Sequence, residues 1–436
     1  MANAILVINA GSSSLKFSAF APNYGMDPVL LLKGQIEGIG TRPRLTARDA
    51  DDHLLVDNAY DATLVNGHNA AIAAVSTWLS TRGRKVQLLA AGHRVVHGGP
   101  DETAAVLITD DLLAKLEKLI PLVPLHQPAN LAGIRALRAH HPTLPQVACF
   151  DTAFHRGHSA IVERFALPEP FYRDGVRRYG FHGLSYEYIV ERFQHLAPQI
   201  ASGKIIIAHL GNGASLCAVQ NGRSVDSTMA FSSLDGLPMG TRCGAIDPGV
   251  LIYLIRERGM SVDQIERLLY NDSGLRGLSG LSSDARDLLA SKDPAAKMAL
   301  DYFILHVCRQ LGSLTALLEG LDAIVFTAGI GEHSPEIREQ ICLHAAWLGV
   351  NLDEAANQAG GPRITLEGSP VSAWVIPTDE ELIIARHTFD LIGPLSTNLM
   401  TSQARLTDGA RHGELFVSSR TPNPAREEGA GDWRRQ

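Results

Sequence analysis

The chain alternates short apolar runs with amphipathic segments, and this pattern predicts strands alternating with helices. The first apolar run, 5–8, meets a small polar turn at 9–14, and a second strand-like run follows at 15–20. The same form returns at 205–219, where Asn221-Gly222 then predicts a hairpin turn. Two hairpins with glycine and serine at their tips, one in each half of the chain, predict a duplicated fold that holds a phosphate from both sides.

The rest of the pattern extends this alternation. Further strands are predicted at 86–91, 146–150, 323–327 and 373–376, with room for more short strands in the polar region 41–66. Helical spacing of apolar residues predicts helices at 69–80, 111–120, 130–140, 185–196, 261–270, 295–319, 335–346 and 378–391. Ser261 to Gln264 and Thr378 to Glu381 have the form of capping boxes. Together these elements predict an α/β fold.

Composition narrows the class of protein. A length of 436 residues predicts two or three domains, and 45% hydrophobic with 19% charged residues is typical of a soluble globular enzyme. A net charge of −7 argues against nucleic-acid or membrane-surface partners, which attract basic proteins. The chain shows no basic leader and no apolar window long enough for a membrane span, so we expect a cytoplasmic protein.

Two further features concern cysteine and the C-terminal end. The five cysteines are scattered without a CxxC pair, which is typical of a reducing compartment and offers no metal framework. From Ser396 onward the periodicity gives way to Gly, Pro, Ser and Arg, so we expect a mostly disordered tail at 396–436 whose removal leaves activity and melting temperature nearly unchanged.

Several polar residues stand where a ligand could meet them. Lys16 follows the glycine and serines of the first hairpin, and either binds a nucleotide phosphate or is a solvated strand lysine. Arg94 and Arg242 lie in glycine-rich segments with few acidic neighbours, where they either bind carboxylate and phosphoryl oxygens or cap a sheet edge. We expect both arginines on loops of a cleft rather than in the core.

Three more candidates have an equally plain structural alternative. Asp151 ends a buried strand, where α/β proteins gather ligand groups, but it could simply cap the next turn. His182 lies in a glycine-flanked loop that permits close backbone approach, although a lone histidine is often structural. Glu380 falls in the first turn of a helix, where the helix dipole favours a carboxylate in any case.

These motifs in this order resemble the acetate kinases, within the superfamily of acetate and sugar kinases, heat-shock chaperones and actin. The resemblance covers about 5–391 and rests on Asn-Ala-Gly-Ser-Ser-Ser-Leu-Lys at 9–16, His-Arg-Val-Val-His-Gly-Gly at 93–99 and Phe-Asp-Thr-Ala-Phe-His at 150–155. It implies two duplicated actin-like (ribonuclease H-like) α/β domains with an active-site cleft between them, and usually a homodimer. The first domain would be 1–151, completed by a C-terminal helix at about 384–395, and the second 152–383.

The resemblance also implies roles for individual residues. Asp151, His182 and Arg242 would be catalytic, and Arg94, Val96, Leu125, Phe181 and Ser233 would bind the acid. Asn9 and Glu380 would lie near Mg²⁺, for which Mn²⁺ can substitute. ATP, the co-substrate, would meet a larger set: Ser12, Ser14, Lys16, His209, Leu210, Gly211, Asn212, Gly213, Asp284, Ala285, Arg286, Gly329, Ile330, Gly331, Glu332 and His333.

Two departures from the family pattern concern nucleotide and acid binding. His333 occupies the place of an asparagine, and Ser233 stands where the family has a proline. The expected activity is reversible, magnesium-dependent phosphoryl transfer between ATP and acetate. The alternatives are a propionate or other short-chain acyl kinase, which would differ only in its acid pocket, and a non-catalytic nucleotide-gated binding module, which would not need Arg94, Arg242 and His182.

Overall fold

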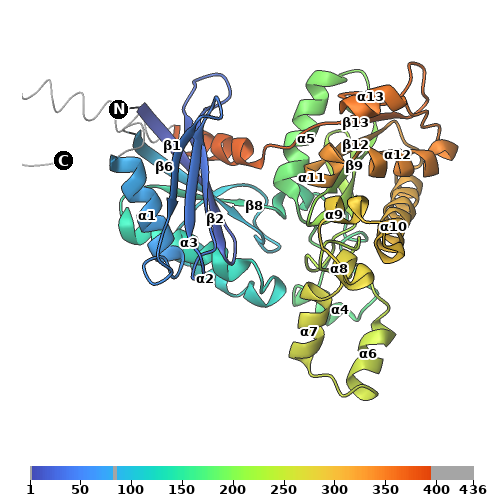
Figure 1. Ribbon diagram of the computed structural model, residues 1–436, viewed down its shortest axis with the longest axis horizontal. Helices are drawn as coiled ribbons and strands as arrows, with labels where there is room; N and C mark the ends of the chain where they lie inside the picture. Colours follow the sequence, from blue (N-terminus) through green and yellow to red (C-terminus); the bar gives the residue numbers. More distant parts are fainter. Residues whose placement is uncertain (1, 82–85, 394–436) are drawn as a thin grey trace, which may run out of the picture. The chain divides into compact units, whose positions relative to one another are not determined.

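The computed structural model describes residues 2–81 and 86–393, and its first half forms an eight-stranded mixed sheet (Figure 1). The strand order is β5-β4-β3-β2-β1-β6-β8-β7. The strands are β1 (Ala2–Ala10), β2 (Ser14–Ala21), β3 (Val29–Glu37), β4 (Arg44–Asp49), β5 (Leu54–Ala59), β6 (Val86–Val95), β7 (Val106–Leu107) and β8 (Gln146–Phe150). The helices of this half are α1 (His68–Thr81), α2 (Asp110–Glu117) and α3 (Gln127–His140), with a 3₁₀ turn η1 (Ile120–Leu122).

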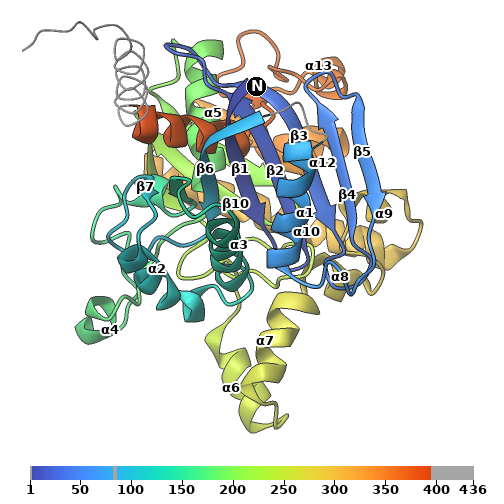
Figure 2. The same cartoon turned by 90° about the vertical axis from the view of Figure 1, so that its left-hand side faces the viewer.

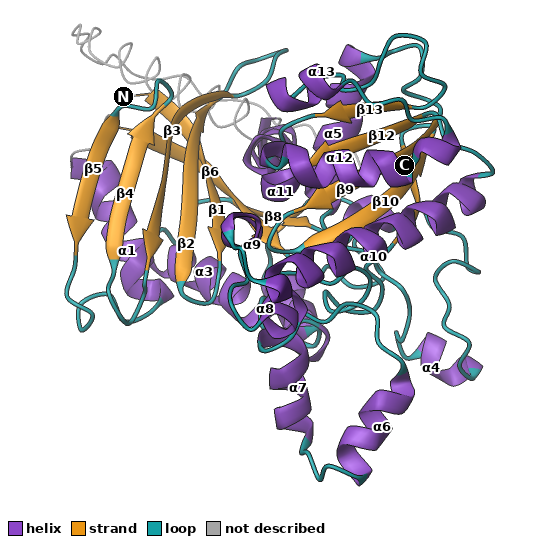
Figure 3. Cartoon of the chain, turned by 45° about the vertical axis from the view of Figure 1, so that its right-hand side comes forward, coloured by secondary structure: helices purple, strands orange, loops and turns teal. Residues whose placement is uncertain are grey.

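The second half is built on a five-stranded sheet of order β11-β10-β9-β12-β13 (Figure 3). Its strands are β9 (Lys204–Leu210), β10 (Ala214–Gln220), β11 (Arg223–Ser227), β12 (Ala323–Thr327) and β13 (Ser372–Val375). The helices are α4 (Glu169–Arg173), α5 (Gly183–Leu196), α6 (Pro248–Arg256), α7 (Val262–Asn271), α8 (Gly274–Ser279), α9 (Ala285–Ala290), α10 (Pro294–Leu318), α11 (Ala328–His333), α12 (Pro335–His344) and α13 (Glu354–Ala359), with 3₁₀ turns η2 (Ala153–His155) and η3 (Ala346–Leu348). Residues 380–393 form a last helix.

The two sheets share one topology, as the repeated hairpin predicts. β1 pairs antiparallel with β2 and parallel with β6, and β9 likewise pairs antiparallel with β10 and parallel with β12. The outer neighbours match as well, because β3 and β8 flank the first set as β11 and β13 flank the second. The α/β architecture with two mixed sheets is therefore confirmed, whereas the exact domain boundaries stay a prediction.

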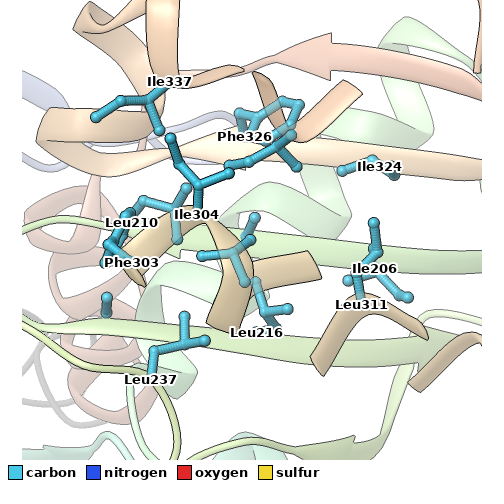
Figure 4. Close-up of a cluster of buried hydrophobic side chains, with 14 of the residues drawn as sticks. Ile206, Leu210, Leu216, Leu237, Phe303, Ile304, Leu311, Ile324, Phe326 and Ile337 are labelled. Atoms are coloured by element: carbon cyan, nitrogen blue, oxygen red, sulfur yellow. The ribbon is translucent and has the colours of Figure 1, made fainter. Parts of the chain in front are cut away.

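Each sheet has its own hydrophobic core. α1 and α3 pack together on the first sheet (Figure 2). α1 buries Ala71, Ile72, Val75, Trp78 and Leu79 there. α10 runs along the second sheet and buries Phe303, Ile304 and Leu311 against it (Figure 4). α5 packs on the other face of the second sheet and the last helix on the other face of the first, so both faces of the inner strands are covered, which accounts for their continuous apolar runs.

Most predicted elements are confirmed, but some of their ends differ. β6 continues from the predicted 86–91 through His93 and Arg94 to Val95, so the expectation that Arg94 lies on a loop is wrong. Pairing with β1 on one side and β8 on the other holds these polar residues in the sheet. α3 begins three residues earlier than predicted, with Pro128 in its first turn, where proline lacks no needed hydrogen bond.

Two local predictions need correction. The segment Ala328–His333, expected as a glycine turn, is the short helix α11, which starts directly after β12. The last helix is capped by Asp379 rather than Thr378, because the Leu382 N–H donates to Asp379 Oδ1 at 2.9 Å while the Thr378 hydroxyl donates to Ser185 Oγ. The predicted tail at 396–436 lies outside the described residues.

None of the helices within residues 2–81 and 86–393 is both long enough and apolar enough to cross a membrane.

Candidate active site

Many of the predicted site residues meet around one cavity of about 350 Å³, which we call the arginine cavity. It is lined by Asn9, Lys16, Arg94, Val96, His126, Asp151, Phe181, His182, His209, Gly213, Met229, Ser233, Arg242, Thr378, Glu380 and Glu381. Strand ends supply much of this lining. Arg94 and Asp151 stand at the ends of β6 and β8, and Asn9 pairs with Lys16 across the β1–β2 hairpin.

Arg94 and Asp151 form a bidentate ion pair in the lining of the arginine cavity. The Arg94 Nε donates to Asp151 Oδ1 at 2.9 Å and its Nη2 donates to Oδ2 at 2.6 Å, while Glu380 Oε2 lies 3.5 Å from Nε. Burial raises the pKa of Asp151 above its usual value and Arg94 opposes this rise. Since both oxygens of Asp151 accept hydrogen bonds, the carboxylate in this geometry is ionised.

Arg94 is protonated in this ion pair. Burial lowers the pKa of Arg94, but Asp151 and Glu380 raise it more, so that the net effect is a rise. Arg94, which is predicted to bind the acid, is therefore always charged. It is paired with Asp151, and part of its side chain is open to the cavity.

His182 and Arg242 belong to different segments of the chain, and their side chains both lie close to Gly213. A methyl group on Gly213 would lie 2.9 Å from Arg242 Nη2 and 3.2 Å from His182 Nε2, so both side chains pass over this glycine. Arg242 Nη1 donates to the Ser233 carbonyl at 2.7 Å, and burial lowers the pKa of Arg242 to about 10, which leaves it charged at neutral pH. The cavity therefore holds two guanidinium groups, of which only Arg94 has a carboxylate partner in the described part of the chain.

His182 is held in place by backbone and side-chain contacts. It adopts a left-handed conformation with φ 58°, and the next residue, Gly183, donates its N–H to the Asp151 carbonyl at 2.8 Å. Its Nδ1 lies 2.8 Å from Ser215 Oγ, which lies 2.5 Å from the Tyr186 hydroxyl. If Tyr186 donates to Ser215 and Ser215 donates to Nδ1, then the Nε2–H of His182 is free to donate into the cavity.

The imidazole rings of His182 and His209 stack with centroids 4.1 Å apart. Burial lowers the pKa of His182 well below its usual value, and His209, Arg94 and Arg242 lower it further. Burial also lowers the pKa of His209 to about 4. Both rings are therefore neutral at physiological pH and serve as hydrogen-bonding groups rather than as charges.

A second hollow adjoins the arginine cavity, and we call it the glycine groove. The β9–β10 turn separates the two, with Gly213 in the cavity and Gly211 and Asn212 in the groove. The groove is about 440 Å³ and is lined by Gly211, Asn212, Ser283, Asp284, Ala285, Arg286, Gly329, Ile330, His333 and Ser334. Asp284 caps α9 by accepting from the Arg286 N–H at 2.9 Å, and its carboxylate also pairs with the Arg286 side chain.

Six predicted site residues line neither hollow. Leu125 is 38% exposed, and Leu210 is fully enclosed in the core of the second half. Glu332 accepts from the Ala328 N–H at 2.8 Å and from the Thr378 N–H at 3.2 Å, so it ties the start of α11 to the segment before the last helix. The others are Ser12 and Ser14 at the first hairpin and the buried Gly331.

The arginine cavity also includes four residues that sequence reasoning did not select. His126 comes from the proline-rich loop at 121–128, where a histidine among apolar residues was the available signal. The sequence predicts Thr378 and Glu381 only as members of a capping box. No sequence pattern marks Met229 as a site residue. Ser283 and Ser334 are the corresponding additions in the glycine groove.

Comparisons with known proteins identify the family of this chain. The model of the acetokinase family matches residues 4–386, so the chain belongs to that family. It is 54% identical to an acetate kinase of Nitrobacter hamburgensis, over 89% of this chain and 96% of that protein, and 53% identical to one of Rhizobium meliloti, over 89% and 98%.

Solved structures give the same assignment. A propionate kinase of Francisella tularensis matches with a TM-score of 0.83 and 36% identity, over 89% of this chain and 100% of that one. An acetate kinase of Porphyromonas gingivalis matches with a TM-score of 0.80 and 35% identity, over 90% and 100%. The expected family and fold are confirmed, and the chain is a phosphotransferase of the acetokinase family.

Proposed function

We propose that this chain transfers the γ-phosphoryl group of ATP reversibly to acetate, giving acetyl phosphate and ADP. The observation that carries the proposal is the convergence of Arg94, Arg242 and His182 on one cavity beside Asp151. A non-catalytic nucleotide-binding module would have no use for two partly buried guanidinium groups at the cavity, and removing such charges from water costs free energy. Strong similarity to acetate kinases supports the same activity.

The chemistry asks for positioning and charge neutralisation rather than for a base. Acetate is already ionised at neutral pH, so its carboxylate can attack the γ-phosphorus directly. Arg242 and the Nε2–H of His182 donate to the equatorial oxygens of the transferring group, where negative charge is spread in the transition state. Arg94 binds the acid, and Asp151 holds Arg94 in its orientation through two hydrogen bonds.

The cavity also suits Mg²⁺, or Mn²⁺ in its place. The Asn9 amide and the Asp151 and Glu380 carboxylates line the cavity together, and such hard oxygen donors are the ones these ions prefer. Asn9 and Glu380 would hold the ion, and Asp151 would orient a bound water. The ion would neutralise phosphate charge on the nucleotide.

For the nucleotide, we assign the phosphates to Ser12, Ser14, Lys16, His209 and the β9–β10 turn, 211–213. The adenosine lies in the glycine groove between 284–286 on one side and Gly329, Ile330 and His333 on the other. Gly211 and Gly329 suit this role because a glycine lets the backbone approach a phosphate closely. His333, in the groove lining, has a side chain that is 76% exposed and would contact the base or ribose.

Propionate is the second candidate acid, because the chain is also similar to a solved propionate kinase. Val96 and Phe181 line the cavity and are nearly fully buried, at 4% and 1% exposure, so that they restrict the length of the acid. We therefore place acetate first and propionate second. Leu125 stays part of the proposed acid pocket only if it moves inward when substrate binds.

We propose further that the chain works as a homodimer in the cytoplasm. The helix α6 (Figure 3) is largely apolar, yet none of its residues is buried. Its exposed apolar side chains include Val250, Ile252, Tyr253 and Ile255. Such a surface is stabilised by a second protein surface. The five cysteines are free, as a reducing compartment requires.

The test of the activity is a comparison of acetate, propionate and butyrate with ATP and Mg²⁺. We expect acetate to have the highest kcat/KM, and acyl phosphate and ADP to form in equal amounts. Preference for propionate would move the second candidate to first place, and ADP release without acyl phosphate would refute the proposal.

A further inference from the structure

Ser233 brings an unpaired hydroxyl group to the lining of the arginine cavity. The residue is 5% exposed, and its Oγ is enclosed without a hydrogen-bond partner in the described part of the chain. Its carbonyl accepts from Arg242 Nη1 at 2.7 Å, which fixes its backbone next to that guanidinium group. Rotation about the Cα–Cβ bond gives the hydroxyl three staggered positions at the cavity lining.

His126 contributes a second unpaired polar atom to the same cavity. Its Nδ1 is buried without a partner in the described part of the chain. Burial, together with the charges of Arg242 and Arg94, lowers the pKa of His126 to about 4, so the ring is neutral. A neutral imidazole offers one donor and one acceptor, and a serine hydroxyl can do both.

The neighbouring lining residues Val96, Phe181 and Met229 are apolar. The methyl group of acetate would satisfy neither Ser233 nor His126, and a buried hydroxyl or imidazole nitrogen without a partner is unfavourable. A substrate that carries a hydroxyl group on the carbon next to the carboxylate would supply the missing partner. A methylene and a hydroxyl together occupy nearly the same space as the ethyl group of propionate.

We infer that the part of the cavity formed by Val96, Phe181, Met229 and Ser233 also accepts a short 2-hydroxy acid, of which glycolate is the smallest. This inference rests on the proposed function and extends it to a second substrate class. The carboxylate oxygen forms a bond to the γ-phosphorus of ATP while the bond from phosphorus to the bridging oxygen breaks. ADP leaves with that electron pair, and the substrate's own hydroxyl donates to, or accepts from, Ser233 and His126 without reacting.

The experiment compares kcat/KM for glycolate and propionate in the wild-type protein and in Ser233→Ala, with acetate as the reference. In the wild type, glycolate should be used better than propionate. In Ser233→Ala the glycolate-to-propionate ratio should fall on the order of five- to tenfold, the effect of one neutral hydrogen bond.

Ser227→Ala is the matched control, because Ser227 also has a buried hydroxyl without a partner in the described part of the chain but does not line the cavity. Its ratio should equal that of the wild type. A second variant, Ser233→Thr, keeps the hydroxyl and should keep the ratio near the wild-type value, while thermal melts show that each variant is folded.

Two results separate this inference from the proposed function. Phosphorylation of acetate with a glycolate-to-propionate ratio that is the same in the wild type and Ser233→Ala overturns the inference and leaves the proposed function standing. Absence of acetate phosphorylation in the folded wild type refutes the proposed function itself.

Discussion

The arginine cavity and the glycine groove adjoin at the β9–β10 turn, but different kinds of residue line them. The cavity is lined by partly or fully buried guanidinium, carboxylate and imidazole groups, and hydrogen bonds such as those of Arg94 with Asp151 and His182 with Ser215 hold them in place. The groove is lined by glycines, serines and the first residues of short helices, and its one guanidinium group, on Arg286, is 83% exposed. Charged groups that must act at one instant of a reaction need fixed positions, whereas binding a nucleotide requires mainly an accessible backbone.

The largest expected effect concerns the buried ion pair of the cavity. Arg94→Ala leaves Asp151, which is 2% exposed, as a buried carboxylate without its partner. Removing one member of such a pair costs about 3–5 kcal/mol. We therefore expect a strongly lowered melting temperature together with almost complete loss of acetate phosphorylation, measured by thermal unfolding and initial rates.

The control for Arg94→Ala is Arg44→Ala, which removes a bidentate arginine–aspartate pair of similar geometry from the exposed β4–β5 hairpin. That variant should melt and react almost as the wild type does. A wild-type melting temperature for Arg94→Ala would show that Asp151 is not held by this pair.

A second test uses one glycine from each region. Gly213→Ala would bring a methyl group to 2.9 Å from Arg242 Nη2 and 3.2 Å from His182 Nε2, so both donors must shift. A displacement of about 1 Å can cost on the order of a hundredfold in rate, and we expect a loss of that size in kcat.

Gly329→Ala is the counterpart in the groove, where a methyl group would meet open space. Its kcat should stay close to that of the wild type, with any change confined to the KM for ATP. Equal loss of kcat in the two variants would erase the distinction between cavity and groove.

A smaller effect is expected in acid selectivity. The wild type should use propionate at about a tenth of the kcat/KM for acetate, a difference of about 1.4 kcal/mol. Val96→Ala removes methyl groups from the cavity and should raise the propionate-to-acetate ratio about fourfold, since one buried methylene is worth about 0.8 kcal/mol.

Val95→Ala is the control for Val96→Ala, because Val95 is equally buried but belongs to the core that lies against α2 and α3. It should lower stability without changing the ratio. If Val96→Ala left the ratio unchanged, the acyl group would have to lie elsewhere.

The smallest effect concerns pH. Burial lowers the pKa of His209 to about 4, whereas an unfolded histidine titrates near 6.5. Between these values the unfolded chain binds a proton that the native state does not, so the free energy of unfolding falls as the pH drops from about 6.5 to about 4. His209→Asn should reduce this dependence by about one proton, measured by urea unfolding between pH 4.5 and 7.5.

The groove variant His333→Asn removes an exposed histidine and is the control for His209→Asn. It should keep the pH dependence of the wild type. If the free energy of unfolding had the same pH dependence in the wild type, His209→Asn and His333→Asn, then His209 would not be buried as described.

Sequence reasoning succeeded where the signal was local. The hairpin at 9–14, the turn at Asn221-Gly222 and the capping box of Ser261 each depend on neighbouring residues, and all are confirmed. The glycine-rich segment around Arg94 predicts a loop, although pairing with β1 and β8 keeps that segment in the sheet. A strand assignment there required knowledge of its neighbours.

In the candidate site, too, local motifs predict the residues but not their arrangement in space. Arg94, Asp151, His182 and Arg242 were selected from their motifs, but their mutual geometry follows from contacts between distant segments. The ion pair of Arg94 with Asp151 and the passage of His182 and Arg242 over Gly213 are examples. His126 and Thr378 were missed because their position at the cavity depends on tertiary packing, and a single sequence does not reveal such packing.

The most direct test of the account compares Arg242→Ala with Arg286→Ala under saturating and limiting ATP. Our central claim is that the arginine cavity stabilises the transferring phosphoryl group, while the glycine groove only binds the nucleotide. We predict that Arg242→Ala lowers kcat at least about a hundredfold with a nearly unchanged KM for ATP and an unchanged melting temperature. Arg286→Ala should raise the KM for ATP with a nearly unchanged kcat. A near-normal kcat in Arg242→Ala, or a loss of kcat in Arg286→Ala as large as that in Arg242→Ala, would contradict the claim.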